Sequence, residues 1–73
     1  MYRAYDVYIR KEDYEKADAI LAQHYRMGEI DDHSVSEETS NGTTVIRYHI
    51  HPYIYEDLEN IIREFEQSGI QVL

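Results

Sequence analysis

The sequence contains no cysteine and no tryptophan, and it has only one proline and three glycines among 73 residues. Without cysteine the chain can form neither disulfides nor a thiolate metal site, so a reducing cytosol is the default compartment. No apolar run approaches the ~18 residues that a membrane-spanning helix needs. The N-terminal stretch MYRAYDVYIR lacks the apolar centre of a signal peptide. We therefore expect a soluble, cytoplasmic protein without a membrane partner.

Basic side chains are also scarce. Seven of them stand against 15 acidic ones, which gives a formal net charge of -8. A chain this acidic is repelled by phosphate backbones and by anionic membranes, so we expect no direct binding to nucleic acid. The length predicts one domain over residues 1–73. Its core should be thin, because a domain of this size buries only about 60% of the surface that its unfolded chain exposes.

The first third of the chain predicts a strand followed by a helix. Residues 3–10 alternate between apolar and polar side chains, which is typical of a half-buried strand. Residues 11–28 then place apolar side chains at helical spacing, with acidic residues in the first turn and Gly28 as the stop. The residues expected to face inward on this helix are Tyr14, Ala17, Ile20, Leu21, His24 and Tyr25.

The middle of the chain, residues 31–51, predicts a β-hairpin. Its turn is Asn41-Gly42, because a two-residue type I′ turn needs positive φ at both central positions. This turn fixes the register, so that Val35 lies opposite Tyr48, Ser36 opposite Arg47 and Asp32 opposite His51. The first arm has almost no apolar residue besides Val35, which favours the edge of a sheet.

The last third predicts a second helix and a short closing strand. The only proline, Pro52, is expected in the first helical turn, and Glu59 is expected to pair with Arg63 on the outer side of the helix. Gly69 ends the helix and residues 70–73 form the strand. The expected apolar stripe of the helix consists of Ile54, Leu58, Ile61, Ile62 and Phe65.

The resulting order, β-α-β-β-α-β, is that of the split βαβ unit. It resembles the ferredoxin-like fold, an α+β domain in which two helices cover one face of a four-stranded antiparallel sheet. Right-handed connections then imply the strand order 4-1-3-2, with the two most apolar strands in the centre. The resemblance concerns topology alone and implies no activity, because this fold supports many unrelated functions.

The acidic residues are concentrated in residues 28–41 and 53–69. Two interpretations stay open. The charge serves solubility alone, or it forms a surface that docks on a basic partner protein. Since basic surfaces often bind nucleic acid, such docking would imitate phosphate charge and block the site. The candidate contacts are Glu37, Glu38, Glu56, Glu59 and Glu66.

Eight tyrosines are present, and four of them, Tyr2, Tyr8, Tyr53 and Tyr55, are expected outside or at the border of the apolar faces. Exposed tyrosines are common at protein interfaces. Tyr8 is the first candidate contact, because it is expected mid-strand on the open face of the sheet, together with Arg47. Stacking of two open faces would give a homodimer, and this structural role is one alternative function.

A second alternative is a module that responds to a metal or a small ligand. His49 and His51 share one face of a strand, and Asp32 is expected across the ladder, so two imidazoles and a carboxylate could bind Zn²⁺ or Ni²⁺. Any strand with histidine at alternate positions shows this pattern, and no fourth ligand is evident. Ordinary exposed polar side chains are the competing explanation.

No arrangement typical of catalysis is present, so we expect no enzyme and no cofactor. The serines lack a glycine elbow and a flanking base, and the glycines are too scattered to cradle a phosphate. TTVIRYHI also does not match the basic, aromatic RNA-binding strand of the RRM. The leading hypothesis is therefore a small acidic binding protein that inhibits a basic, nucleic-acid-binding partner, as phage or mobile-element counter-defence and regulatory factors do.

Overall fold

The computed structural model describes residues 3–73, apart from the side chain of Asp32. A short 3-10 turn, η1, leads from the first strand into the first helix, and the hairpin separates the two helices. In chain order the elements are β1 (Tyr5–Arg10), η1 (Lys11–Asp13), α1 (Tyr14–Arg26), β2 (Ile30–Ser40), β3 (Thr43–Pro52) and α2 (Tyr55–Gln67).

The sheet is antiparallel, with β3 between β1 and β2. The C-terminal residues lie along the other side of β1, where Val72 forms a single antiparallel bridge with Ile9 and the amide of Leu73 donates to the carbonyl of Tyr8 at 2.8 Å. The closing strand expected over residues 70–73 is therefore reduced to this bridge. A small α+β domain with an antiparallel sheet and two helices is confirmed.

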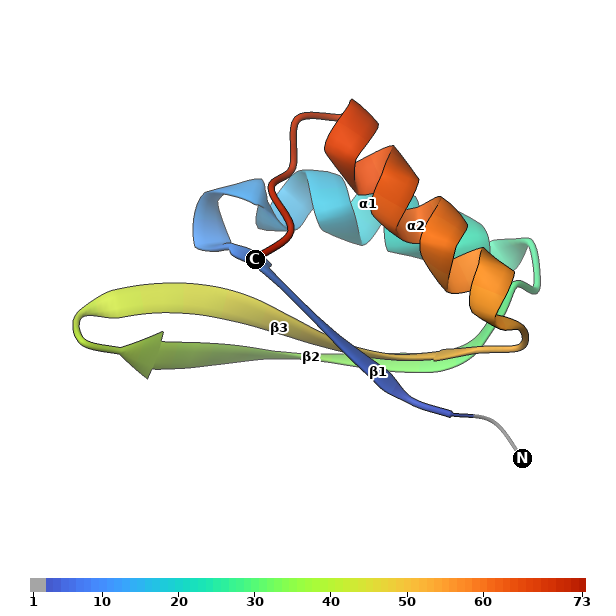
Figure 1. Cartoon of the computed structure of the whole chain (residues 1–73), viewed down its shortest axis with the longest axis horizontal. Coiled ribbons are helices and arrows are strands. Elements are labelled where there is room, and N and C mark those ends of the chain that lie inside the picture. Colours follow the sequence, from blue (N-terminus) through green and yellow to red (C-terminus); the bar gives the residue numbers. More distant parts are fainter. Residues whose placement is uncertain (1–2) are drawn as a thin grey trace.

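The hairpin has the predicted turn and register. Asn41 has a φ of 54° and Gly42 a φ of 77°, the left-handed values that a type I′ turn requires. Val35 pairs with Tyr48, and Asp32 pairs with His51. The strands are longer than the helices above them, so the turn end of the hairpin projects beyond the rest of the molecule (Figure 1).

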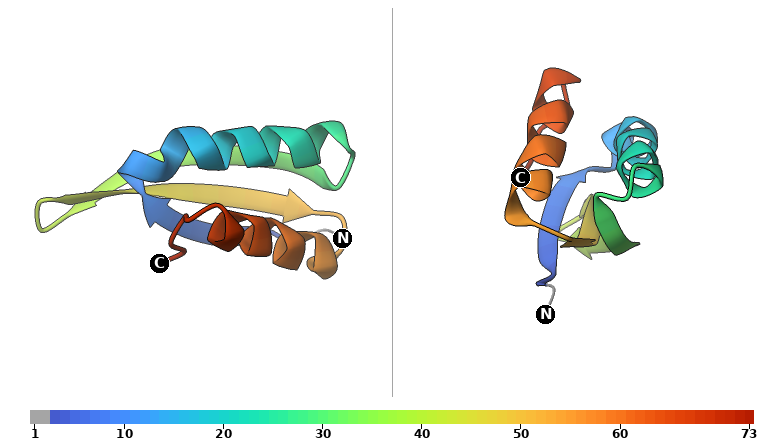
Figure 2. Two further views of the ribbon diagram at one scale, coloured as in Figure 1. Left: turned by 90° about the horizontal axis from the view of Figure 1, so that it is seen from above. Right: turned by 90° about the vertical axis from the view of Figure 1, so that its right-hand side faces the viewer.

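Both helices cover the same face of the sheet (Figure 1). Seen from above and from the side, α1 lies over the β2 side and α2 over the β1 side (Figure 2). Inward side chains from both helices, from β1 and β3, from the start of β2 and from the segment after α2 form one core. Its buried apolar residues are Val7, Ile9, Ala17, Leu21, Ile30, Ile46, Tyr48, Ile50, Leu58, Ile61, Phe65 and Ile70.

The beginning of the second helix differs from the prediction. Pro52 is buried at the end of β3, opposite Ile30, and the helix starts at Tyr55. A proline is tolerated at this strand end, since the pairing has an irregularity next to Ile30. Ile54 is the extended residue before the helix and is exposed, so its expected place in the apolar stripe is wrong.

The prediction for Tyr25 is also wrong, because its side chain is 52% exposed and its ring meets His33 edge-on. Helical periodicity extended the inward stripe one residue too far, and the core beneath this last turn is filled by His24 instead. Neither helix in the described part of the chain combines the length and the hydropathy that crossing a membrane requires.

Candidate protein-docking surfaces

The outer side of α2 is the first acidic surface. The helix buries Leu58, Ile61 and Phe65 on one side, and its periodicity therefore turns the intervening positions to solvent. We name the exposed carboxylates Glu56, Glu59 and Glu66 the α2 acidic face. Within the described chain no basic group forms an ion pair with these three carboxylates.

The one basic residue of α2 has a different partner from the one expected. Arg63 donates from Nη1 to the Asn60 side-chain oxygen at 3.0 Å, rather than pairing with Glu59. Glu56, Glu59, Asn60 and Arg63 line a shallow polar depression on this side of the helix. The α2 acidic face thus forms no ion pair within the helix and keeps a net negative charge of two, because three carboxylates stand against the one guanidinium of Arg63 beside them.

The other two predicted acidic contacts do not join this surface. Glu37 and Glu38 lie in the projecting half of β2, and as neighbours on a strand they point to opposite faces of the sheet. On the helix side Glu37 lies 3.4 Å from Lys11 Nζ, whereas Glu38 lies 3.9 Å from Arg47 Nε. The five carboxylates predicted as one surface are therefore distributed over three.

The open face of the sheet carries a polar network centred on Asp6. Arg47 donates from Nη2 to one carboxylate oxygen of Asp6 at 2.9 Å, and His49 Nδ1 lies 2.7 Å from the other. The hydrogen bonds from His49 and Arg47 hold the pKa of Asp6 below its usual range. Tyr8 lies directly opposite Arg47 in the β1–β3 ladder and is half-buried. Tyr8 and Arg47 thus share a face, as predicted, but that face is polar.

The predicted metal ligands are only partly brought together. The rings of His49 and His51 meet edge to face, with centroids 5.1 Å apart. The backbone of Asp32 pairs with that of His51 as expected, but the side chain of Asp32 lies outside the described part of the structure. Among the described side chains, no group of three His, Cys, Asp or Glu residues is arranged to hold a metal ion.

A buried histidine forms a bridge that sequence analysis did not foresee. His24 Nδ1 lies 2.5 Å from Glu29 Oε2, and Nε2 lies 2.8 Å from Glu64 Oε2. Burial disfavours the charged ring, but the hydrogen bonds to Glu64 and Glu29 outweigh it and raise the pKa of His24. The bridge ties the end of α1 to α2 and to the loop before β2. The inward position of His24 was the only available signal, since Glu64 is 40 residues away.

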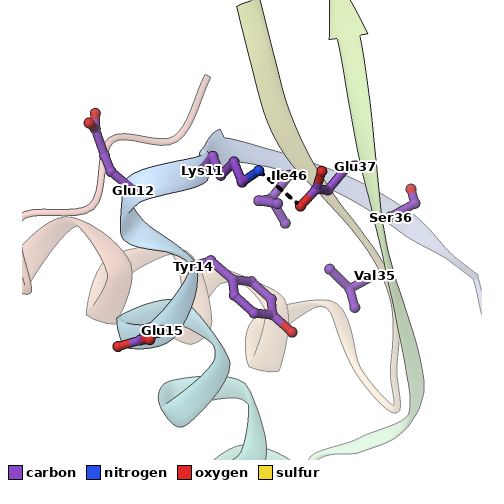
Figure 3. A pocket seen from close by; sticks show the side chains of 8 residues that line it. All are labelled: Lys11, Glu12, Tyr14, Glu15, Val35, Ser36, Glu37 and Ile46. Atoms are coloured by element: carbon purple, nitrogen blue, oxygen red, sulfur yellow. Dashed lines mark ion pairs between the residues drawn. The ribbon is translucent and has the colours of Figure 1, made fainter.

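A groove of about 370 Å³ opens between the start of α1 and β2 (Figure 3). Its apolar part consists of Tyr14, Val35 and Ile46. Lys11 and Glu37 form an ion pair across one end (Figure 3). Glu12 and Glu15 stand at the outer rim. The groove is open on one side, so it suits the side chain of a docked polypeptide better than an enclosed small molecule.

Comparison with known proteins adds no relative to this picture: no protein-family model, no curated protein and no solved structure matches the chain.

Proposed function

We propose that this protein is a non-catalytic binding protein that docks on the basic surface of a partner protein and masks it. A basic surface that binds nucleic acid is the partner site that this charge fits best. The biological setting that we propose is inhibition or regulation in the cytoplasm, of the kind found in phage or mobile-element counter-defence. The frame that we propose for it is the ferredoxin-like arrangement, which the order β1-β3-β2 and the terminal bridge beside β1 support.

The observation that carries this proposal is the way the basic side chains are used. Arg10 pairs with Glu12 and Asp13, and Arg47 pairs with Asp6, all on β1, η1 and the open face. Neither of these cations pairs with the α2 acidic face, and the one cation that the described residues place beside that face, Arg63, donates to Asn60 instead. An excess of exposed charge of one sign attracts partners of opposite sign and accelerates their association.

The experiment uses the intact tagged protein as bait in a nuclease-treated extract of the native host. We expect a partner that binds at low ionic strength, elutes with salt and binds nucleic acid when purified. Added polyanion should compete with the bait for it. A captured partner without a basic surface, or one whose binding polyanions do not affect, would contradict the proposal.

Two charge-matched variants test the position of the charge rather than its amount. Glu59→Gln with Glu66→Gln removes two negative charges from the α2 acidic face. Ala19→Lys with Gln23→Lys adds two positive charges at exposed positions of α1. Both variants change the net charge equally, and only the first should weaken binding substantially. Equal weakening by both would show that net charge alone attracts the partner.

A further inference from the structure

The outer edge of β2 is a long, unpaired strand edge. β2 has 11 residues and pairs only with β3 among the described elements. In an antiparallel ladder, every second residue of an edge strand turns its N–H and C=O outward. Such an edge is a template for an added strand.

The hydrogen bonds at the opposite edge of the sheet show which residues of β2 turn their backbone N–H and C=O groups toward the free edge. The carbonyl of Tyr8 accepts from Leu73, so the backbone of Tyr8 faces away from β3. Its partner Arg47 therefore turns its backbone N–H and C=O groups toward β2, so that Arg47 and Ser36 are a hydrogen-bonded pair of the β2–β3 ladder. It follows that the neighbours of Ser36, Val35 and Glu37, present N–H and C=O at the free edge.

The groove described above lies beside this same stretch of strand. Val35 and Glu37 line it from β2, while Tyr14 and Lys11 line it from α1 and η1 (Figure 3). A strand added to β2 would direct alternate side chains to the helix side of the sheet, next to Tyr14, Val35 and Ile46. The backbone groups that an added strand would pair with thus lie next to a groove that can take one of its side chains.

The charge of β2 selects the occupant. The strand carries Asp31, Asp32, Glu37 and Glu38 and has no Lys or Arg. The ion pair of Glu37 with Lys11, at 3.4 Å, joins two exposed side chains, so it is weak and easily exchanged. A second copy of this acidic chain would be repelled at this edge, whereas a basic segment would be attracted.

We propose that an extended, basic segment of the partner protein adds to β2 as a further strand and places the aliphatic stem of a basic side chain in the groove. In this arrangement Lys11 is an intramolecular stand-in that the partner's basic group displaces from Glu37. This inference rests on the proposed function and names the class of segment that is recognised.

The test is a titration of the intact protein with the peptide acetyl-Thr-Arg-Val-Arg-Val-Arg-Thr-amide, followed by amide NMR. We expect shift changes and slower amide exchange at Val35 and Glu37, with changes at Tyr14, and none on α2. The matched peptide with Pro in place of each Val cannot pair as a strand and should not bind.

Substitutions in the protein test the same contact. Glu37→Gln should lower the affinity for the peptide by up to about fivefold, which is the range of an exposed ion pair. Glu37→Pro also removes an N–H that points to the free edge, and it leaves the β2–β3 hydrogen bonds intact. It should lower the affinity for the peptide about tenfold. Asp57→Asn removes an equal charge from α2 at a residue outside the α2 acidic face, and it should leave the affinity for the peptide unchanged. Amide dispersion reports whether each variant is folded.

The outcomes separate this inference from the proposed function. Binding that maps to α2, or that persists in the Pro-containing peptide and in Glu37→Pro, would overturn strand addition while leaving docking on a basic surface intact. Absence of any peptide binding at low ionic strength would overturn strand addition as well. The proposed function fails separately, if the captured partner is indifferent to polyanions.

Discussion

Two buried polar side chains have opposite effects on stability. The ring of His24 has a carboxylate at each nitrogen, whereas the hydroxyl of Tyr48 is buried with no hydrogen-bond partner in the described structure. The charged form of His24 is stabilised by its neighbours. Burial raises the pKa of Tyr48, so its hydroxyl stays neutral. Because this hydroxyl has no hydrogen-bond partner among the described residues, it adds no favourable polar contact.

The bridge at His24 predicts a pH-dependent stability. Because the folded-state pKa lies above the ordinary ~6.5, the stabilisation is fully present below about pH 6.5 and is lost as the pH rises through the folded-state value. Urea unfolding measured between about pH 5.5 and about pH 9 should show this contribution to the free energy of unfolding decreasing as the pH rises.

The variant His24→Gln isolates the effect from His33, His49 and His51. We expect it to cost about 2 kcal/mol at the acidic end of the range, since two charge-assisted hydrogen bonds are replaced, and less at the alkaline end. A difference between the two proteins that does not vary with pH would mean that folding leaves the pKa of His24 unchanged.

Removing the hydroxyl of Tyr48, which is unpaired in the described structure, should not destabilise the fold. Tyr48→Phe removes the buried hydroxyl and keeps the ring stacked against Tyr14, whose centroid is 6.4 Å away. We expect the free energy of unfolding to stay unchanged or to rise by about 1 kcal/mol. A loss of more than that in urea unfolding would show that the hydroxyl has a stabilising contact.

At the scale of elements, the hairpin is the part that the sequence defines best. Asn41-Gly42 fixes both the turn and the alternation, and the register followed from them. The same alternation implied that Glu37 and Glu38 point to opposite faces, so the separation of these two contacts was predictable. The break between Pro52 and Tyr55 was not, because a proline suits a helix start and a strand end equally well.

Contacts between distant elements were beyond the reach of sequence patterns. Periodicity placed His24 inward but gave no reason to bring Glu64 to it. The groove likewise depends on how α1 crosses β2, which side-chain spacing along one element does not determine. Local chemistry therefore predicted the elements, while the packing of one element on another produced the site.

The turn itself predicts a local effect on the hairpin. An added Cβ at Gly42 meets nothing within 4 Å, so the cost of Gly42→Ala comes from its φ of 77° alone, about 1 kcal/mol. Because the turn end projects beyond the helices (Figure 1), amide exchange should accelerate in residues 38–45 and stay unchanged in β1. Asn41→Gly, which keeps the left-handed conformation accessible, is the control. Uniform acceleration through the core would contradict this.

The whole molecule carries its charges in a way that favours a single copy. The open face, where two copies would stack, is occupied by the network of Asp6, Arg47 and His49, and burying such groups is costly. We expect light scattering to give a mass near 8.7 kDa. A mass near twice that value, returned to the monomer by Tyr8→Glu, would favour the homodimer instead.

The central claim is that acidic residues of this protein steer it onto a basic partner. It is tested most directly by the association rate constant for the captured partner as a function of salt. Because screening has a Debye length of about 10 Å at 0.1 M salt, the rate constant should fall steeply between low and physiological ionic strength, and the fall should be shallower in the variant Glu59→Lys with Glu66→Lys. An association rate indifferent to salt and to these reversals would show that the acidity serves solubility alone.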